Sequence, residues 1–257
     1  MRNVRVIAKL EVKPPNLVKG IQLEGLRKLG NPNDFAVKYY KQGIDEIIYE
    51  DQIASLLGRN GILDIIEKTT DNVFVPITVG GGIQSVENVS DALRAGADKI
   101  SINSAAIQNP SILKDIAKRF GSQCLILSIQ AKKQTNSWEP YYDCGREHSG
   151  LDAIEWAKLG EQLGVGEILL TSIDQDGTKK GFDIELIRKV TDSVSIPVIA
   201  SGGMGSCDDI FQAISKGKAD AVAIAHVLHY DLFTTAQIKK YCMNKGINID
   251  NYNEDLL

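Results

Sequence analysis

Cysteine and histidine are scarce in this sequence, and neither residue forms a metal-ligand pattern. Only three histidines occur in 257 residues, and the four cysteines are scattered without CxxC spacing. Because structural zinc sites use closely spaced Cys and His ligands, no zinc site is expected. Dispersed cysteines are typical of proteins from a reducing compartment. No other motif indicates a cofactor, so we expect the chain to work without a bound metal or cofactor.

The chain also lacks the excess of basic charge and the long apolar runs that indicate nucleic-acid or membrane binding. It has 29 Lys and Arg against 33 Asp and Glu, a formal net charge of −4. That balance leaves no basic footprint for nucleic acid or an anionic membrane surface. No run approaches the roughly 18 apolar residues of a membrane span, and the opening MRNVRVIAKLEVK is too charged for a signal peptide. We expect a soluble cytoplasmic protein.

What the sequence does contain is a regular alternation of short β-branched runs and longer amphipathic segments. Eight runs predict strands, at residues 4–12, 45–51, 75–79, 98–103, 124–129, 166–172, 196–201 and 220–226. Segments between them, such as NDFAVKYYKQG and PSILKDIAKRFG, have the apolar spacing of helices. Eight apolar strands, each followed by a helix, predict an α/β fold, a closed (β/α)8 TIM barrel. A doubly wound open sheet is less favoured, since no GxGxxG follows the first strand.

An internal repeat divides the chain into two similar halves. VPITVGGGIQSVENVSDALRAGADKISINSAA, at 75–106, resembles IPVIASGGMGSCDDIFQAISKGKADAVAIAHVL, at 196–228. Both segments read strand, glycine cluster, helix and strand. Self-similarity at a long period indicates repeated structural units. We therefore expect one domain over residues 1–257, built from two half-barrels at about 1–122 and 123–257.

Glycine clusters follow two equivalent strands of the predicted barrel. Gly80, Gly81 and Gly82 follow one strand and Gly202 and Gly203 follow its counterpart, each cluster directly before a predicted helix. Active sites of these barrels form at the carboxyl ends of the strands. Glycines there let backbone N–H groups approach an anion, although a lone cluster is usually only a tight turn. Two equivalent clusters predict two phosphate sites facing each other across the barrel mouth, and hence a ligand with a phosphate at each end.

Further polar side chains are predicted at the same end of the barrel. These are Glu11, Glu50, Asp51, Asp174 and Asp176 among the carboxylates, and Ser101, Asn103, Thr171 and Ser201 among the uncharged groups. DQDGT, at 174–178, begins like a calcium loop but lacks the glutamate that such a loop requires. Asp176 and Gly177 therefore either line the pocket or form an ordinary Asp-Gly turn.

A ring of four charges is predicted inside the opposite, N-terminal end of the barrel. Its members are Arg5, Glu46, Lys99 and Glu167. Because side chains alternate along a strand, three of them share the orientation of Glu11, Asn103 and Thr171 on the same strands. Glu46 is the repeat counterpart of Glu167. Buried charges are costly unless each is paired, so the ring is either a structural plug or a polar gate into the barrel interior.

These residues resemble the cyclase subunits of imidazole glycerol phosphate synthase, from histidine biosynthesis. The resemblance covers essentially the whole chain, and its most specific runs are VPITVGGGI, AGADKISINSAA, RFGSQC, GEILLTSIDQDGTKKG and IPVIASGG. It implies a lyase of the (β/α)8 fold within a glutamine amidotransferase system. A separate glutaminase would dock at the N-terminal barrel face, and its ammonia would cross the barrel to a bisphosphate substrate.

The resemblance also implies roles for individual residues. The family's ammonia gate matches the ring of four charges, and Asp98 matches a residue that contacts the glutaminase. Lys19 matches a lysine of a mobile loop after the first strand, and His226 stands where the family more often has a serine near a phosphate. The expected substrate- and phosphate-binding residues are Lys19, Gly81, Gly82, Asn103, Thr171, Asp176, Gly177, Gly202, Gly203 and His226.

The chain departs from the family at the catalytic positions. The family uses two aspartates, at the ends of strands one and five, as acid and base, and the chain has Glu11 and Gln130 there. An amide can neither give nor take a proton near neutral pH, and acid–base catalysis contributes about 10²- to 10⁴-fold. Two prolines also restrict the loop after strand one, which reads LEVKPPN.

Three functions are consistent with these departures. The first is the cyclase of histidine biosynthesis, which makes imidazole glycerol phosphate and an aminoimidazole carboxamide ribotide. The second is a diverged paralogue that supplies glutamine-derived ammonia to another reaction, such as sugar amidination in surface-polysaccharide synthesis. The third is a conduit subunit that only activates its glutaminase.

Overall fold

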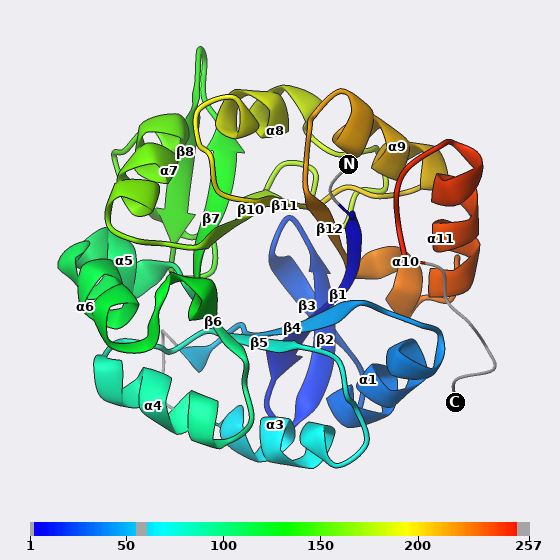
Figure 1. Ribbon diagram of the computed structural model, residues 1–257, viewed down its shortest axis with the longest axis horizontal. Coiled ribbons are helices and arrows are strands. Elements are labelled where there is room, and N and C mark those ends of the chain that lie inside the picture. The colour runs from blue at the N-terminus through cyan, green and yellow to red at the C-terminus, as the bar shows by residue number, and fades with distance from the viewer. Residues whose placement is uncertain (1–2, 55–60, 251–257) are drawn as a thin grey trace.

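The computed structural model describes residues 3–54 and 61–250 of the chain, and a closed barrel of eight parallel strands forms its centre (Figure 1). The barrel strands, in their order around the ring, are β1 (Arg5–Lys13), β4 (Glu46–Asp51), β5 (Ile77–Gly80), β6 (Lys99–Ile102), β7 (Leu125–Lys133), β10 (Glu167–Ser172), β11 (Val198–Ser201) and β12 (Ala221–Ile224). Parallel pairing of β12 with β1 closes the ring. The predicted TIM barrel is confirmed, with all eight strands at the expected places.

Helices surround the barrel on its outside (Figure 1). They are α1 (Pro32–Lys41), α3 (Leu63–Thr70), α4 (Val86–Arg94), α5 (Ser104–Gln108), α6 (Ser111–Phe120), α7 (Ala153–Gln162), α8 (Ile184–Thr191), α9 (Cys207–Ser215), α10 (His226–His229) and α11 (Thr235–Asn244), with a 3-10 turn at Ser122–Cys124. Several begin at a capping side chain, as where Asp152 accepts from two backbone N–H groups of α7. No helix in the described part of the chain combines the length and apolar character of a membrane span.

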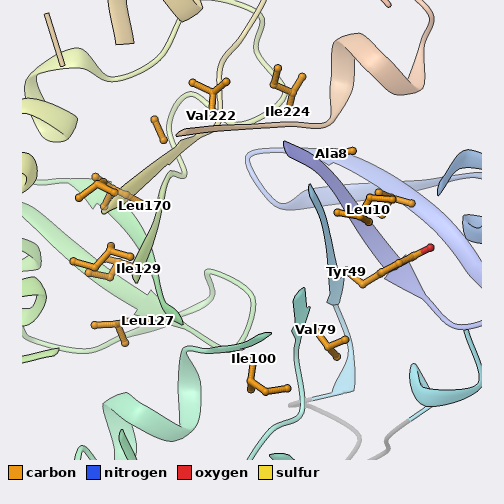
Figure 2. Close-up of a cluster of buried hydrophobic side chains, with 14 of the residues drawn as sticks. Ala8, Leu10, Tyr49, Val79, Ile100, Leu127, Ile129, Leu170, Val222 and Ile224 are labelled. Carbon is orange, nitrogen blue, oxygen red and sulfur yellow. The ribbon is translucent and has the colours of Figure 1, made fainter. Parts of the chain in front are cut away.

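Alternation of side chains along the strands gives the barrel two separate apolar layers. Outward-facing residues such as Leu10, Tyr49 and Leu127 pack beneath the helices (Figure 2). Inward-facing residues form a second cluster, made of Ile7, Ile48, Ile126, Leu169, Ile199, Ala221 and Ala223. Burying each large aliphatic side chain contributes about 1.5–3 kcal/mol. Because side chains alternate along a strand, the inward-facing residues of β1 are Arg5, Ile7, Lys9 and Glu11.

Two antiparallel hairpins extend the barrel beyond the predicted strands. After β1, β2 (Asn16–Ile21) and β3 (Glu24–Gly30) pair with each other, and β2 also pairs with the end of β1. After β7, β8 (Trp138–Tyr142) and β9 (Glu147–His148) form the equivalent extension. Where the resemblance implied a mobile loop, the structure has a hairpin, which crosses the barrel opening (Figure 1). It docks on the segment after β10, where Gln22 N donates to Asp176 O at 2.9 Å.

A buried histidine packs between α1 and the barrel and gives the fold a pH-dependent stability. His229 Nδ1 lies 2.6 Å from the hydroxyl of Tyr39, and the two rings stack with centroids 5.8 Å apart. Burial, followed by the positive charge of Lys19, lowers the pKa of His229 to about 3. Since the unfolded chain takes up this proton near pH 6.5, the contribution of His229 is present above that pH and is lost as pH falls toward 3.

Between pH 7 and pH 5 we expect His229 to lower the free energy of unfolding by about 2 kcal/mol. In His229→Phe, the free energy of unfolding should therefore fall by about 2 kcal/mol less between pH 7 and pH 5 than in the wild type. Urea unfolding at both pH values measures this difference. Tyr39→Phe is the matched control, because it removes the hydroxyl and keeps the imidazole buried. Equal pH dependence in the wild type and His229→Phe would contradict the assignment.

Candidate functional site

Glu11, at the carboxyl end of β1, forms a buried ion cluster with groups from two other elements. Lys19 Nζ, on β2, donates to Glu11 Oε1 at 3.0 Å and Oε2 at 2.8 Å, and to Asp176 Oδ2 at 2.8 Å. All three side chains are buried. Burial opposes the charge of Lys19, but the carboxylates of Glu11 and Asp176 raise its pKa above the ordinary value. The hairpin thus holds a charged lysine at the barrel mouth.

Gln130, near the end of the barrel portion of β7, lies on a cavity of about 100 Å³. Its side chain is 6% exposed, and Oε1 has no hydrogen-bond partner among the described residues. Asn103 lines the same cavity and donates to a backbone carbonyl of β8 at 3.1 Å. Gly81 and Gly82 form another part of its wall. The first glycine cluster and the amide at the predicted reaction centre therefore share one cavity.

The other glycine cluster belongs to a second, smaller cavity of about 20 Å³. Predicted site residues on its wall are Lys19, Asp176, Gly177, Gly202, Gly203 and His226. Gly203 has a φ of 111°, and a Cβ there would lie 2.0 Å from Gly181 O. The backbone at this position therefore requires glycine. The two glycine clusters thus border distinct cavities, formed by different strand ends.

The glycine clusters do not directly precede helices, which corrects the prediction from sequence. α4 begins at Val86 and α9 at Cys207, so that the turns 83–85 and 204–206 intervene. The left-handed φ values at Gly81, Gly82 and Gly203, 90°, 72° and 111°, redirect the chain before each turn begins. Of the backbone N–H groups in these segments, those of Gly205 and Ser206 donate to Asp209 Oδ2, and that of Gln84 donates to Asn88 Oδ1.

His226 introduces an imidazole into the smaller cavity. Its Nδ1 has no hydrogen-bond partner within the described ranges. Burial, then the positive charges of Lys179 and Lys19, lower the pKa of His226. The imidazole is therefore neutral at neutral pH and can donate one hydrogen bond to an anionic ligand, whose charge would in turn favour its protonation.

Two residues predicted to act on the substrate border neither cavity. Glu11 lies against Lys19, and Thr171 faces the barrel interior beside Gln130 in the β7–β10 pairing. Thr171 Oγ1 is buried and has no hydrogen-bond partner in the part of the chain that is described. Direct contact of Glu11 and Thr171 with a substrate stays a prediction.

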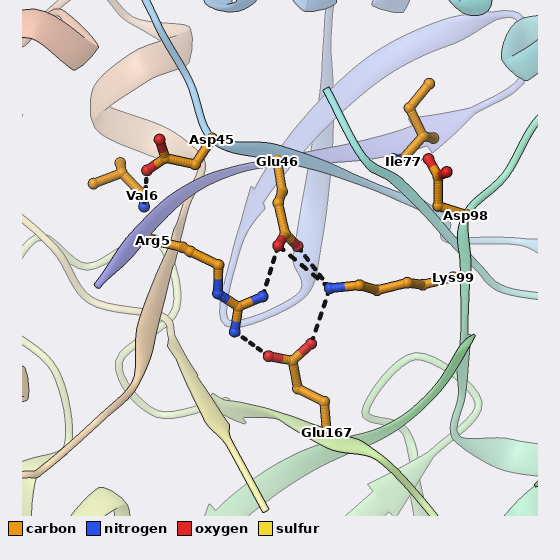
Figure 3. A network of polar contacts seen from close by, with 8 residues as sticks. All are labelled: Arg5, Val6, Asp45, Glu46, Ile77, Asp98, Lys99 and Glu167. Carbon is orange, nitrogen blue, oxygen red and sulfur yellow. Dashed lines mark hydrogen bonds and ion pairs between the residues drawn. The ribbon is translucent and has the colours of Figure 1, made fainter. Parts of the chain in front are cut away.

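The four charges predicted at the N-terminal end form a closed ring of ion pairs (Figure 3). Arg5 Nη1 donates to Glu46 Oε1 at 2.7 Å, and Nη2 donates to Glu167 Oε1. Lys99 Nζ donates to Glu46 Oε2 at 3.1 Å and to Glu167 Oε2 at 3.3 Å. The glutamates are buried, with side chains 8% and 9% exposed. Each buried carboxylate thus has two cationic partners, as its burial requires.

Asp98 lies beside this ring and is exposed. Its Oδ2 accepts a hydrogen bond from Ile77 N at 2.8 Å, and Asp45 Oδ2 accepts one from Val6 N at 2.7 Å (Figure 3). These carboxylates satisfy backbone donors at the starts of neighbouring strands. Contact of Asp98 with a partner protein stays a prediction.

The sequence analysis missed a buried lysine inside the barrel. Lys9 is 1% exposed, and its Nζ lies 2.9 Å from Glu50 Oε2 and 3.7 Å from Glu11 Oε1. Burial opposes its charge, but the carboxylates of Glu50 and Glu11 raise the pKa of Lys9. The parity that placed Arg5 and Glu11 in the interior applies equally to Lys9, and could have identified it.

Comparisons with known proteins agree with this geometry. The family model described as "Histidine biosynthesis protein" matches residues 5–234. A Legionella pneumophila protein named imidazole glycerol phosphate synthase subunit HisF is 60% identical over 210 residues, covering 81% of this chain and 99% of the relative. A protein of the same name from Dehalococcoides mccartyi is 46% identical over 97% of this chain and 98% of its own length. Another protein of that name, from Trichormus variabilis, is 45% identical over 98% of this chain and 100% of its own length.

Proposed function

Because the chain belongs to the histidine biosynthesis protein family, we propose that it is the cyclase subunit of an imidazole glycerol phosphate synthase. In this reaction, ammonia and a phosphoribulosyl aminoimidazole nucleotide give imidazole glycerol phosphate and an aminoimidazole carboxamide ribotide. The observation that carries the proposal is 46% identity over 97% of the chain to a protein of that name. A role in supplying ammonia to a different reaction is not favoured, since the relatives are named for the synthase.

Substrate binding is proposed to use both cavities at the barrel mouth. Each contains a glycine-lined turn whose backbone N–H groups can bind a phosphate. Lys19 adds a positive charge to the smaller cavity, and His226 adds a hydrogen-bond donor. Two glycine-lined cavities at one barrel mouth support a substrate with a phosphate at each end, and Gln130 would lie beside its reacting centre.

Ammonia is proposed to enter through the ring of Arg5, Glu46, Lys99 and Glu167. Lys99 is the member best placed to move, because its contacts are longer than the Arg5–Glu46 contact and its stem is flexible. When Lys99 turns away, Arg5 still pairs with both glutamates, so that neither carboxylate is left uncompensated. A glutaminase partner docked on this face, near Asp98, would deliver the ammonia. The relatives' designation as subunits supports such a partner.

The experiment that tests the proposal is an ammonia-dependent cyclase assay on the purified chain alone. We expect equimolar formation of the two products from the bisphosphate nucleotide and an ammonium salt, at a rate that rises with the concentration of free ammonia. A reaction without ammonium salt is the control. Absence of both products at saturating ammonia would contradict the proposed function.

A further inference from the structure

A layer of polar side chains lies inside the barrel, next to the apolar interior cluster. This buried polar layer consists of Lys9, Glu50, Thr78, Ser101 and Ser128, each at most 5% exposed. They come from β1, β4, β5, β6 and β7, and Thr78 and Ser101 are in register with Ile48 and Ile126 of the apolar cluster. Polar groups buried at this depth are costly unless they are paired or serve a ligand.

Glu50 is the carboxylate of this layer, and only part of its hydrogen-bonding capacity is used. Ser128 Oγ donates to Glu50 Oε1 at 3.3 Å. Lys9 Nζ is 2.9 Å from Glu50 Oε2, and the two groups form a buried ion pair. Neither atom has another hydrogen-bond partner among residues 3–54 and 61–250. Lys9 and Ser128 therefore hold the carboxylate in place, one on each oxygen.

That carboxylate borders the larger of the two cavities at the mouth. Glu50, Ser101 and Ser128 line it together with Gln130 and Asn103, whereas Glu11 does not. Oxygen acceptors on Gln130 and Asn103 lack hydrogen-bond partners in the described chain, and Glu50 lies beside them. A ligand that fills this cavity must therefore present hydrogen-bond donors, and a nitrogen that carries protons is the simplest such group.

Glu50 belongs to a cluster of buried charged side chains at the mouth. Inside the mouth, the carboxylates of Glu11, Glu50 and Asp176 face the ammonium groups of Lys9 and Lys19. Asp51 is a further buried carboxylate on the cavity wall, and its Oδ1 accepts from Ile53 N and Ala54 N. A carboxylate at this cavity can take up and release a proton during a reaction, which an amide such as Gln130 cannot do.

We propose that Glu50 is the proton-transferring carboxylate of this site, and that it acts on a nitrogen nucleophile that adds to a carbonyl carbon of the ligand. The inference rests on the proposed function, which supplies ammonia and the ketone. Ammonia forms the new N–C bond with its lone pair, and the C=O π pair moves to oxygen. Glu50 carries two protons, one at a time, from nitrogen to oxygen. Water then leaves, a C=N bond remains, and Glu50 is again a carboxylate.

The variant Glu50→Gln tests this role, because it keeps the shape of the side chain and removes its proton transfer. Because the variant takes the nearest carboxylate from buried Lys9, which keeps Glu11 at 3.7 Å, its folding is verified by circular dichroism before the assay. We expect ammonia-dependent kcat to fall about 10²- to 10⁴-fold. Adding Gln130→Glu to that variant returns a carboxylate to the same cavity and should restore at least about 10-fold. Glu185→Gln is the matched control, because Glu185 is an exposed residue of α8, and it should leave kcat unchanged.

The possible results separate the two proposals. An active wild type with an equally active Glu50→Gln overturns the role of Glu50 and leaves the cyclase proposal standing. An inactive wild type overturns the cyclase proposal, and the role of Glu50 with it. If Glu50→Gln does not fold, Glu50→Asp retracts the carboxylate by one methylene and should lower kcat about 10-fold with little change in KM. Unchanged kcat in Glu50→Asp would then overturn the role of Glu50.

Discussion

Replacement of Lys19 with methionine is expected to lower the free energy of unfolding by about 3–5 kcal/mol, the usual cost of breaking a buried ion pair on one side. Lys19 is the only ammonium group within hydrogen-bond distance of both Glu11 and Asp176 among the described residues. Without it, three buried carboxylates face Lys9 alone. Methionine matches the volume of the lysine stem, so the loss measures charge rather than packing. Urea unfolding at pH 7 measures the difference.

The matched control for Lys19→Met is Lys133→Met. Lys133 pairs with Glu185 at 2.9 Å, but both side chains are more than half exposed, at 51% and 57%. Exposed pairs contribute about 0–1 kcal/mol. Equal stability losses in the two variants would show that burial of Lys19 does not determine its contribution. Lys19→Met should also raise the KM for the bisphosphate substrate, because it removes a charge from the smaller cavity.

Gly203→Ala is expected to reduce cyclase kcat/KM about 10²-fold or more. An alanine Cβ would lie 2.0 Å from Gly181 O, a backbone atom that cannot rotate away. The turn that lines the smaller cavity must then shift, and a displacement of about 1 Å at a binding site already costs about 10²-fold in rate. Initial rates at varied substrate concentration give kcat/KM directly.

Gly150→Ala separates this steric effect from backbone strain. Gly150 has a φ of 71°, also in the left-handed region, but an added Cβ there meets no atom within 4 Å. This variant should lose about 1 kcal/mol of stability from strain and keep its catalytic rate. If Gly203→Ala were as active as Gly150→Ala, the turn at Gly203 would not position the substrate.

Sequence reasoning predicted the parts of this protein that follow from periodicity. Apolar runs identified all eight barrel strands, because strands buried on both faces are nearly continuously apolar. The parity of side chains predicted that Arg5, Lys99 and Glu167 face the interior, and the repeat added Glu46. Both patterns depend only on local geometry, which the chain carries in its residue order.

The arrangement at the mouth depends on contacts between distant segments and was not predicted. The hairpin of β2 and β3 brings Lys19 onto Glu11, which separates that carboxylate from both cavities. Exposed residues of β3 and the proline within β8 gave no alternating strand pattern. Glu50 was placed at the correct end of the barrel, but its pairing with Lys9 became visible only with the strands in register.

The most direct test of the account follows the nitrogen atom of ammonia. The purified chain is incubated with ¹⁵N-labelled ammonium chloride and the bisphosphate nucleotide, and the products are separated and examined by ¹⁵N NMR. If the chain is the ammonia-using cyclase, we expect one labelled nitrogen in the imidazole ring of imidazole glycerol phosphate and none in the aminoimidazole carboxamide ribotide. An unlabelled imidazole product, or no product at any ammonia concentration, would contradict it.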